Sequence, residues 1–268
     1  MILFPNCKIN LGLHILHKRE DGFHDLETVF YPLPLQDALE VITAEESIFS
    51  HSGIEIPGDV TDNLCNKAYS LLKADYPQLP PVHIHLHKNI PIGAGLGGGS
   101  ADGAYALKLL NIKYNLDIPE EKLEAYAARL GSDCPFFIRN QSCFATGRGE
   151  ILEPWTVDLS GYSFLLVHPG IHVNTGWAFG QLTPGLPETG LKEVNWKDVS
   201  SWKGALTNDF EGPVFREYPA IRNIKEKMYR AGAIYATMSG SGSAVVGIFP
   251  KEQWPEAVWE PHYRVFQL

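Results

Sequence analysis

Five glycines fall within ten residues in the segment Pro91-Ile92-Gly93-Ala94-Gly95-Leu96-Gly97-Gly98-Gly99-Ser100, which continues into Ala101. A strand is predicted before this glycine segment, because residues 82–87 (Val-His-Ile-His-Leu-His) alternate apolar and polar side chains. The Ala- and Leu-rich residues 100–110 predict a helix after it. Glycines between a strand and a helix let backbone N–H groups converge on an anion at the positive end of the helix. The segment, with Ala101, is therefore a predicted phosphate-binding site.

Two known nucleotide-binding patterns can be compared with the glycine segment. The GxxxxGK[ST] pattern of the P-loop is excluded, because Ser100 follows a glycine and not a lysine. The dinucleotide pattern GxGxxG does match residues 93–98, and Asp117 lies about 20 residues further on, as that pattern requires. However, a helix is predicted after Asp117, so the βαβ context of the pattern is missing. A dinucleotide site and a purely structural glycine turn stay open as alternatives.

The composition indicates an acidic globular protein of 268 residues, with a formal net charge of −9 and 44% hydrophobic residues. A chain of this length forms one large domain or two of ordinary size. Because there is no run of Lys or Arg, nucleic acid is not expected as a partner. No window approaches the roughly 18 consecutive apolar residues of a membrane span, so no membrane partner is expected either. An anionic nucleotide would have to be bound by backbone N–H groups, one or two cations and Mg²⁺.

The sequence contains the four cysteines Cys7, Cys65, Cys134 and Cys143. None belongs to a CxxC pair or to a metal-binding spacing, and the first residues lack the basic and long apolar regions of a signal peptide. We therefore expect reduced thiols and a cytoplasmic location.

The rest of the chain predicts alternating strands and helices. Short apolar runs separated by Gly, Pro and Asp predict a small N-terminal sheet, with strands at 8–16, 26–33 and 39–42. Further strands are expected at 162–168 and within 235–249, on both sides of a second glycine-rich turn at 239–243. Helices are predicted at 62–74, 119–130 and 221–231. The polar, irregular residues 185–202 are expected to form a mobile surface insertion.

Two charged residues have unusual neighbours. Lys8 and Asn10 project from one face of a predicted apolar strand, where a lone lysine is most simply an edge residue that prevents aggregation. Asp133 lies between Gly131 and Pro135, where a lone aspartate is usually a turn or capping residue. Asp133 could also be the general base for a hydroxyl, since phosphoryl transfer requires mainly positioning and charge neutralisation.

Together these elements resemble the GHMP kinase superfamily over nearly the whole chain. The motifs that carry the resemblance are Lys8-Ile9-Asn10-Leu11, Asp21-Gly22-Phe23-His24, Gly95-Leu96-Gly97-Gly98-Gly99-Ser100-Ala101, Gly131-Ser132-Asp133-Cys134-Pro135-Phe136-Phe137 and Met238-Ser239-Gly240-Ser241-Gly242-Ser243-Ala244. The Asp-Gly-Phe-His motif resembles the branch that phosphorylates a cytidine diphosphate-linked polyol of the non-mevalonate isoprenoid pathway. The resemblance implies a kinase for such a small molecule, with ATP and Mg²⁺ as cofactors.

The resemblance also implies the fold, which is α+β with two lobes. An N-terminal, ATP-binding lobe of mixed sheet and helices would span residues 1–157, and a smaller C-terminal α+β lobe would span residues 158–268. The active site would lie in the cleft between them. The boundary is expected near Asp158, and the chain is expected to be a monomer or weak dimer.

By the same resemblance, Asp133 would take the proton from the 2-hydroxyl of the substrate. Lys8 would stabilise the charge on that oxygen and keep Asp133 ionised, because a cation within about 4–6 Å favours the carboxylate. Asn10 would orient the polyol, and Gly240 and Ser241 of the second glycine turn would contact the substrate.

The cytosine of the substrate would stack between two aromatic rings. Phe23 would supply one ring, at a position where tyrosine is the family's frequent choice, and His24 would hydrogen-bond the edge of the base. The second ring would come from Trp177 or Phe179, and the spacing after Asn174 favours Phe179. Taken alone, a histidine in such a turn is usually a surface or capping residue.

The resemblance implies Mg²⁺ held largely by phosphate oxygens and water, with Ser100 as a candidate protein ligand. Asn63 would approach the adenine, although its position also suits a helix N-cap. The histidines at 83, 85 and 87 share one face of a strand but are spaced about 6.7 Å apart along it. They cannot easily converge on one ion, so no metal site is predicted there.

Two other functions stay open. The chain could be a GHMP kinase for another small alcohol, or a catalytically silent member of the superfamily retained for nucleotide or partner binding. The silent member is disfavoured because Lys8, Asp133 and both glycine turns are all present.

Overall fold

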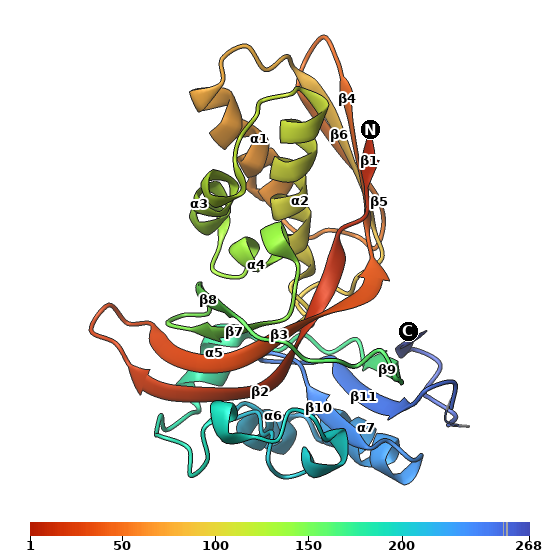
Figure 1. Ribbon diagram of the computed structural model, residues 1–268. Helices are drawn as coiled ribbons and strands as arrows, with labels where there is room; N and C mark the ends of the chain where they lie inside the picture. Colours follow the sequence, from red (N-terminus) through yellow and green to blue (C-terminus); the bar gives the residue numbers. More distant parts are fainter. Residues whose placement is uncertain (254, 256) are drawn as a thin grey trace. The chain divides into compact units, whose positions relative to one another are not determined.

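The computed structural model describes residues 1–253, 255 and 257–268, which form two compact units (Figure 1). Unit 1 comprises residues 1–8, 34–92 and 97–141, and unit 2 comprises residues 9–33, 93–96 and 142–268. The chain therefore passes from one unit to the other within its early strands and within the glycine segment. The lobe boundary near Asp158 stays a prediction. No helix in the described part of the chain is long and apolar enough to cross a membrane.

Unit 1 is built on a sheet whose strand order is β1 (Ile2–Leu3), β4 (Ala38–Thr43), β6 (Val82–Lys88) and β5 (Ile48–Gly53). Strand β6 pairs antiparallel with β4 and parallel with β5. Its alternating sequence buries Val82, Ile84 and Leu86 on one face, as predicted. Strand β5 has no counterpart among the predicted strands, since its run Ser-His-Ser at 50–52 carries no apolar alternation.

The three histidines of β6 face serines of β5. Ser50 Oγ lies 2.7 Å from His83 Nε2 and 2.8 Å from His85 Nδ1. Ser52 Oγ lies 3.0 Å from both His85 Nε2 and His87 Nδ1. Hydrogen bonding to the neighbouring strand thus accounts for the histidine row. Within the described residues, no group of three or more His, Cys, Asp or Glu side chains could hold a metal ion.

The helices of unit 1 lie beside this sheet (Figure 1). They are α1 (Leu64–Asp75), α2 (Gly98–Lys113), α3 (Glu120–Leu130) and α4 (Cys134–Arg139), with the short 3-10 turn η1 (Val60–Asp62) before α1. Helix α2 packs against α1, β1 and β4, and α3 packs against α4. The first three helices match predicted ones, although α2 begins at Gly98, two residues before Ser100. Helix α4, directly after Asp133, is an additional element.

Unit 2 contains most of a first sheet and all of a second. The first has the order β2 (Asn6–Lys18), β3 (His24–Gln36), β7 (Cys143–Thr146) and β8 (Ile151–Pro154). The second has the order β10 (Tyr235–Met238), β11 (Val245–Pro250), β9 (Tyr162–His168) and β12 (Arg264–Gln267), with antiparallel neighbours. The predicted strands at 8–16, 26–33 and 162–168 are confirmed, whereas β7, β8 and β12 have no predicted counterpart.

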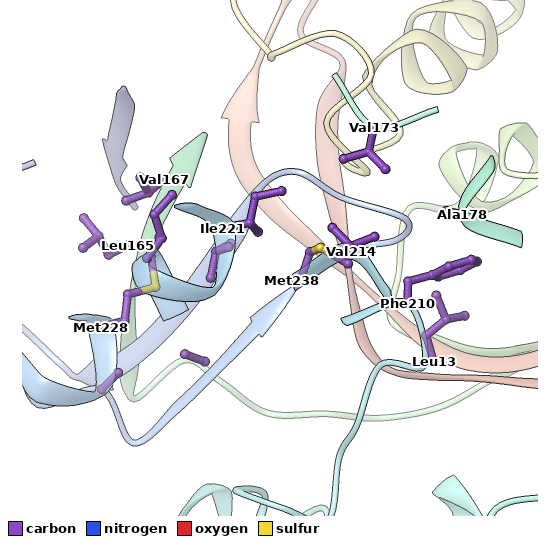
Figure 2. Close-up of a cluster of buried hydrophobic side chains, with 14 of the residues drawn as sticks. Leu13, Leu165, Val167, Val173, Ala178, Phe210, Val214, Ile221, Met228 and Met238 are labelled. Atoms are coloured by element: carbon purple, nitrogen blue, oxygen red, sulfur yellow. The ribbon is translucent and has the colours of Figure 1, made fainter. Parts of the chain in front are cut away.

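The helices of unit 2 are α5 (Thr175–Gly180), α6 (Glu211–Glu217) and α7 (Pro219–Arg230). Helices α6 and α7 bury Val214, Ile221 and Met228 in a cluster that also contains Leu165 of β9 and Met238 of β10 (Figure 2). Burial of such apolar surface stabilises the fold by roughly 25 cal/mol per Å². This core supports the second glycine turn, which directly follows β10.

Residues 185–202 differ from the expected mobile surface insertion. They contain the 3-10 turns η2 (Leu191–Glu193) and η3 (Val199–Ser201), and the side chains of Leu191, Val199 and Trp202 are buried. The backbone N–H of Leu191 also donates to Glu27 Oε1 at 3.0 Å. The prediction is wrong for this anchored part, because its apolar residues are spaced too irregularly to give a periodic signal.

All four cysteines are buried, and none of them forms a disulfide with any described residue. Burial raises the pKa of the Cys7 and Cys134 thiols to about 12. Burial also raises the pKa of the Cys65 thiol well above its ordinary value. The expectation of reduced thiols agrees with this arrangement.

Candidate active site

The two residues expected to act in catalysis meet within unit 1. Lys8 Nζ lies 3.4 Å from Asp133 Oδ2, and the Lys8 side chain is 5% exposed while that of Asp133 is 33% exposed. Lys8 therefore does not have the role of an exposed edge lysine that prevents aggregation, because such a residue points into solvent. A buried ammonium group beside a partly exposed carboxylate can neutralise charge that develops at the carboxylate's open side.

Asp133 occupies the N-cap position of α4, yet its side chain makes no capping hydrogen bond. A side-chain capping role therefore does not describe its carboxylate, which is paired with Lys8 instead. The stem of Lys8 packs beside the glycine segment, since a Cβ at Gly97 would lie 3.2 Å from Lys8 Cγ and Cε. The ion pair thus lies next to the start of α2.

The part of the glycine segment in unit 1 forms the open N-terminus of α2. Gly97 is the N-cap with φ of 69°, a left-handed conformation that favours glycine. A Cβ at Gly99 would meet nothing within 4 Å, so the first turn faces open space. The Ser100 hydroxyl, in the same turn, hydrogen-bonds the thiol of Cys134. Unpaired N–H groups at such a helix end attract an anion.

The part of the glycine segment in unit 2 lies against the second glycine turn. Ala94 O accepts a 3.1 Å hydrogen bond from Ala244 N, and Gly95 O accepts one of 2.8 Å from Ser239 Oγ. The backbones of Gly95 and Ser239 lie close together, because a Cβ at Gly95 would be 1.9 Å from Ser239 O. Two turns that lie far apart in the sequence are thereby joined.

Asn10 is buried and joined to the same turn. Its Nδ2 donates to Thr28 Oγ1 at 3.0 Å, and its backbone N–H donates to Ser239 Oγ at 3.3 Å. Ser239 Oγ also lies 3.5 Å from Asn10 Oδ1, so bonds at both ends fix the orientation of the Asn10 amide, which a residue that positions a substrate requires.

Gly240 and Ser241 continue the second glycine turn. Gly240 O accepts a 2.9 Å hydrogen bond from Asn208 Nδ2. Ser241 Oγ lies 3.0 Å from Thr175 Oγ1, at the start of α5. The turn therefore lies next to the helix that carries both candidate aromatic rings.

The structure places Phe179, and not Trp177, beside His24. The His24 and Phe179 rings stack with centroids 4.8 Å apart and planes 16° apart. The Phe179 and Phe210 rings also meet edge to face, with centroids 4.9 Å and planes 88° apart. The Trp177 ring instead packs against Tyr218, at 5.9 Å. Burial, and to a smaller extent the charge of Lys18, lowers the pKa of His24, which favours a neutral ring with one donor and one acceptor.

Phe23 lies in the preceding turn and is 54% exposed. Asp21 Oδ1 accepts a 3.1 Å hydrogen bond from Phe23 N, which shapes the turn. The guanidinium of Arg148 lies 4.8 Å from the centroid of the Phe23 ring, a cation–π contact. Sequence reasoning missed Arg148, because no local pattern links it to a turn so far away in the chain.

Unit 1 also contains a pocket of about 210 Å³ beside the start of α2. Its wall is formed by Phe49, His51, Ile56, Pro57, Gly58, Asp59, Val60, Asp62, Asn63, Leu64, Gly99 and Asp102. Asn63 Oδ1 accepts a 2.9 Å hydrogen bond from Cys65 N, so Asn63 is the N-cap of α1 as well as part of the wall. The apolar wall residues suit a flat, mostly apolar group such as a nucleobase. They carry no motif, which is why the sequence did not reveal them.

A buried ion-pair network joins the two ends of the glycine segment. Lys88, at the end of β6, donates to Asp37 and, at 2.7 Å, to Asp102 Oδ2 of α2. Asp37 Oδ1 accepts from the backbone N–H groups of Asn89 and Ile90, at 2.6 and 2.8 Å. All three charged side chains are at most 4% exposed. The network fixes the strand end before the segment to the helix after it.

Two family models match the chain. One, described as the GHMP kinases N terminal domain, matches residues 63–141, and the other, GHMP kinases C terminal, matches residues 189–266. The first match contains the glycine segment and Asp133, and the second contains the second glycine turn.

Curated relatives match over nearly the whole chain. A protein of Bacteroides fragilis named 4-diphosphocytidyl-2-C-methyl-D-erythritol kinase is 54% identical over 257 residues, which cover 94% of this chain and 93% of the relative. A protein of Cytophaga hutchinsonii with the same name is 52% identical, with 93% and 92% covered.

Comparison with solved structures leads to the same family of kinases. A crystal structure of 4-(cytidine 5′-diphospho)-2C-methyl-D-erythritol kinase matches with a TM-score of 0.79 and 33% identity, covering 92% of this chain and 90% of that one. A mevalonate kinase, 14% identical with a TM-score of 0.68, shows the shared fold alone. The expected α+β fold of a GHMP kinase is confirmed. The chain therefore belongs to the 4-diphosphocytidyl-2-C-methyl-D-erythritol kinase family of the GHMP kinases.

Proposed function

We propose that the chain transfers the γ-phosphoryl group of ATP to the 2-hydroxyl of 4-diphosphocytidyl-2-C-methyl-D-erythritol, in the non-mevalonate isoprenoid pathway. The observation that carries the proposal is the ion pair of Lys8 and Asp133 beside the open start of α2. It occurs in a chain whose relatives at 51–54% identity carry the name of this kinase.

In the proposed reaction, the 2-hydroxyl oxygen forms a bond to the γ-phosphorus as the bond from that phosphorus to the β,γ-bridging oxygen breaks, and ADP leaves. Asp133 takes the hydroxyl proton on its partly exposed carboxylate. Lys8 stabilises the charge on the attacking oxygen, and Asn10 orients the polyol. Gly240 and Ser241 would contact the substrate beside it.

The nucleotide would be bound by residues 91–101, whose N–H groups at the start of α2 suit the phosphates. The base would occupy the pocket that Asn63 lines. Mg²⁺ would be held mainly by phosphate oxygens and water, and the half-buried Ser100 hydroxyl in the first turn of α2 would offer it one protein oxygen. The ion would neutralise charge on the phosphate oxygens.

The cytosine would stack on Phe179 and Phe23, and the His24 ring, which is stacked on Phe179 in this structure, would move to the edge of the base. Phe179→Ala is expected to raise the KM for the cytidine-containing substrate about ten- to hundredfold, because one base–aromatic stack contributes about 1–3 kcal/mol. The KM for ATP should change little. Steady-state kinetics with each substrate varied in turn checks this, together with thermal unfolding, since Phe179 also touches Phe210.

The variant Trp177→Ala, in the same helix, decides between the two rings. Its ring packs against Tyr218, so we expect a smaller rise in the KM for the cytidine-containing substrate. A larger rise for Trp177→Ala than for Phe179→Ala would assign the stacking ring to Trp177.

A coupled ADP-release assay with Mg·ATP tests the proposed function directly. Turnover is expected with 4-diphosphocytidyl-2-C-methyl-D-erythritol and not with the same polyol phosphate lacking the cytidine. Equal turnover of both would contradict base recognition, and turnover only of another alcohol would indicate a different GHMP kinase. Tight ATP binding without turnover of any alcohol would indicate a silent member.

A further inference from the structure

Phe23 carries an exposed aromatic ring on the surface of unit 2. It lies in the turn between β2 and β3 and is 54% exposed. Hydrogen bonds fix its backbone, since Phe23 O accepts from Arg19 N at 2.8 Å and Phe23 N donates to Asp21 Oδ1 at 3.1 Å. They do not fix the ring, whose position depends on its own side-chain torsions. A ring that stacks on a base binds it more tightly when it is already held in place, because ordering a side chain opposes binding.

The guanidinium of Arg148 is the group that meets this ring. Its central carbon lies over the ring, 4.8 Å from the centroid. Among the described residues, no second cation and no aromatic ring makes such a contact with Phe23. One face of the ring is therefore covered, and the large exposed fraction of Phe23 shows that the remainder of the ring is open.

The turn after β7 holds Arg148 at this place. Strand β7 pairs antiparallel with β3, so the residues that follow β7 lie beside the start of β3. Leu26 N donates to Gly147 O at 2.8 Å, which joins the two segments. Glu150 Oε2 accepts from Arg148 N at 2.5 Å, and Glu150 Oε1 lies 3.4 Å from Arg148 Nε. Arg148 is thus anchored on the same sheet as the turn that carries Phe23.

The charge of Arg148 is already balanced by carboxylates. Glu150 is its ion-pair partner. The Phe23 N–H is the main cause that lowers the pKa of the Asp21 carboxyl, and the charges of Arg19 and Arg148 add to this effect. An anionic diphosphate would meet the repulsion of these carboxylates beside the guanidinium. What Arg148 offers to a bound substrate is therefore its flat face against the ring, more than its charge.

We propose that Arg148 is a positioning residue for the cytosine of the substrate, because it holds the Phe23 ring by one face and keeps the other face ready for the base. The inference rests on the proposed function, which takes the ligand to contain cytosine. Phenylalanine has no hydroxyl group that could fix the ring, so the cation–π contact performs that task here. Cytosine, Phe23 and Arg148 would then form three stacked layers.

Arg148→Met removes the planar cation and keeps a long side chain. The KM for the cytidine-containing substrate is expected to rise about two- to fivefold, which corresponds to the loss of one exposed cation–π contact. The values of kcat and of the KM for ATP should not change, because Arg148 acts on neither the reacting atoms nor the nucleotide. Arg129→Met is the matched control, since the Arg129 guanidinium lies 5.9 Å from the Tyr126 ring in α3. It should leave all three constants unchanged.

A double-mutant cycle with Phe23→Ala separates positioning from direct contact with the substrate. If Arg148 acts through the ring, adding Arg148→Met to Phe23→Ala should raise the KM no further. An equal rise in both backgrounds would show that Arg148 contacts the substrate itself, for instance its diphosphate, and would overturn the inference. An unchanged KM in Arg148→Met, or a fall in kcat alone, would overturn it as well.

The protein without substrate provides an independent readout. NMR relaxation of an isotope-labelled Phe23 ring should show lower order in Arg148→Met than in the unsubstituted protein. Equal order in both would overturn the inference, whatever the KM does. If the ring loses order as expected but calorimetry detects no binding of cytidine diphosphate to the unsubstituted protein, the proposed substrate is contradicted, and with it the use of the ring.

Discussion

Asp133→Asn is expected to lower kcat by about a hundred- to ten-thousandfold, the range typical of a lost general base. The amide keeps the shape of the side chain and cannot take the hydroxyl proton. The substitution also removes the anionic partner of the buried Lys8 ammonium, so some loss of stability is expected, although Asp133 makes no capping hydrogen bond with α4. The measurement is the ADP-release rate at saturating substrates, with thermal unfolding recorded in parallel.

Lys8→Ala should lower kcat as well, since it removes the cation 3.4 Å from Asp133. Asp198→Asn serves as the control, because Asp198 is an exposed capping aspartate that accepts from Ser200 N, away from the glycine segment in sequence. It should leave kcat unchanged. Near-native turnover by both Asp133→Asn and Lys8→Ala would disprove the proposed mechanism.

Gly95→Ala is expected to lower the free energy of unfolding by about 2–5 kcal/mol. Gly95 has φ of 79°, and a left-handed backbone costs a residue with a Cβ about 1–2 kcal/mol. The new Cβ would also lie 1.9 Å from Ser239 O, and such overpacking typically costs about 1–3 kcal/mol more. Chemical denaturation gives the change in unfolding free energy.

Gly99→Ala is the matched substitution in the same segment. A Cβ at Gly99 meets nothing within 4 Å, and the residue lies in α2, where alanine is the better helix former. The free energy of unfolding of Gly99→Ala should equal that of the unsubstituted protein or exceed it. Similar destabilisation in both variants would show that the contact with Ser239 is not what requires a glycine at position 95.

The parts of the site that the sequence predicted are those marked by local patterns. The glycine segment, with a strand before it and a helix after it, follows from periodicity and composition within about 30 residues. Lys8 and Asp133 are conspicuous because each is a charge among apolar residues. Their contact at 3.4 Å followed only from the family resemblance, since no local rule joins residues so far apart.

The pocket and the ion-pair network could not be predicted in this way. Lys88 pairs with Asp37, which lies 51 residues earlier, and with Asp102, which lies 14 residues later. Neither separation matches a strand or helix period, so the pairing arises only when sheet and helix pack together. The same holds for Phe49 and Val60, which become a pocket wall only after β5 has paired with β6.

The burial of the four cysteines has a practical consequence for following motions of the folded chain. A thiol reagent attacks the exposed thiolate, so Cys7, Cys65 and Cys134, with raised pKa values, should stay unmodified until their surroundings open. Cys7, Cys65 and Cys134 belong to unit 1 and Cys143 to unit 2. Mass-resolved labelling kinetics would then report the opening of each unit separately, without any introduced probe.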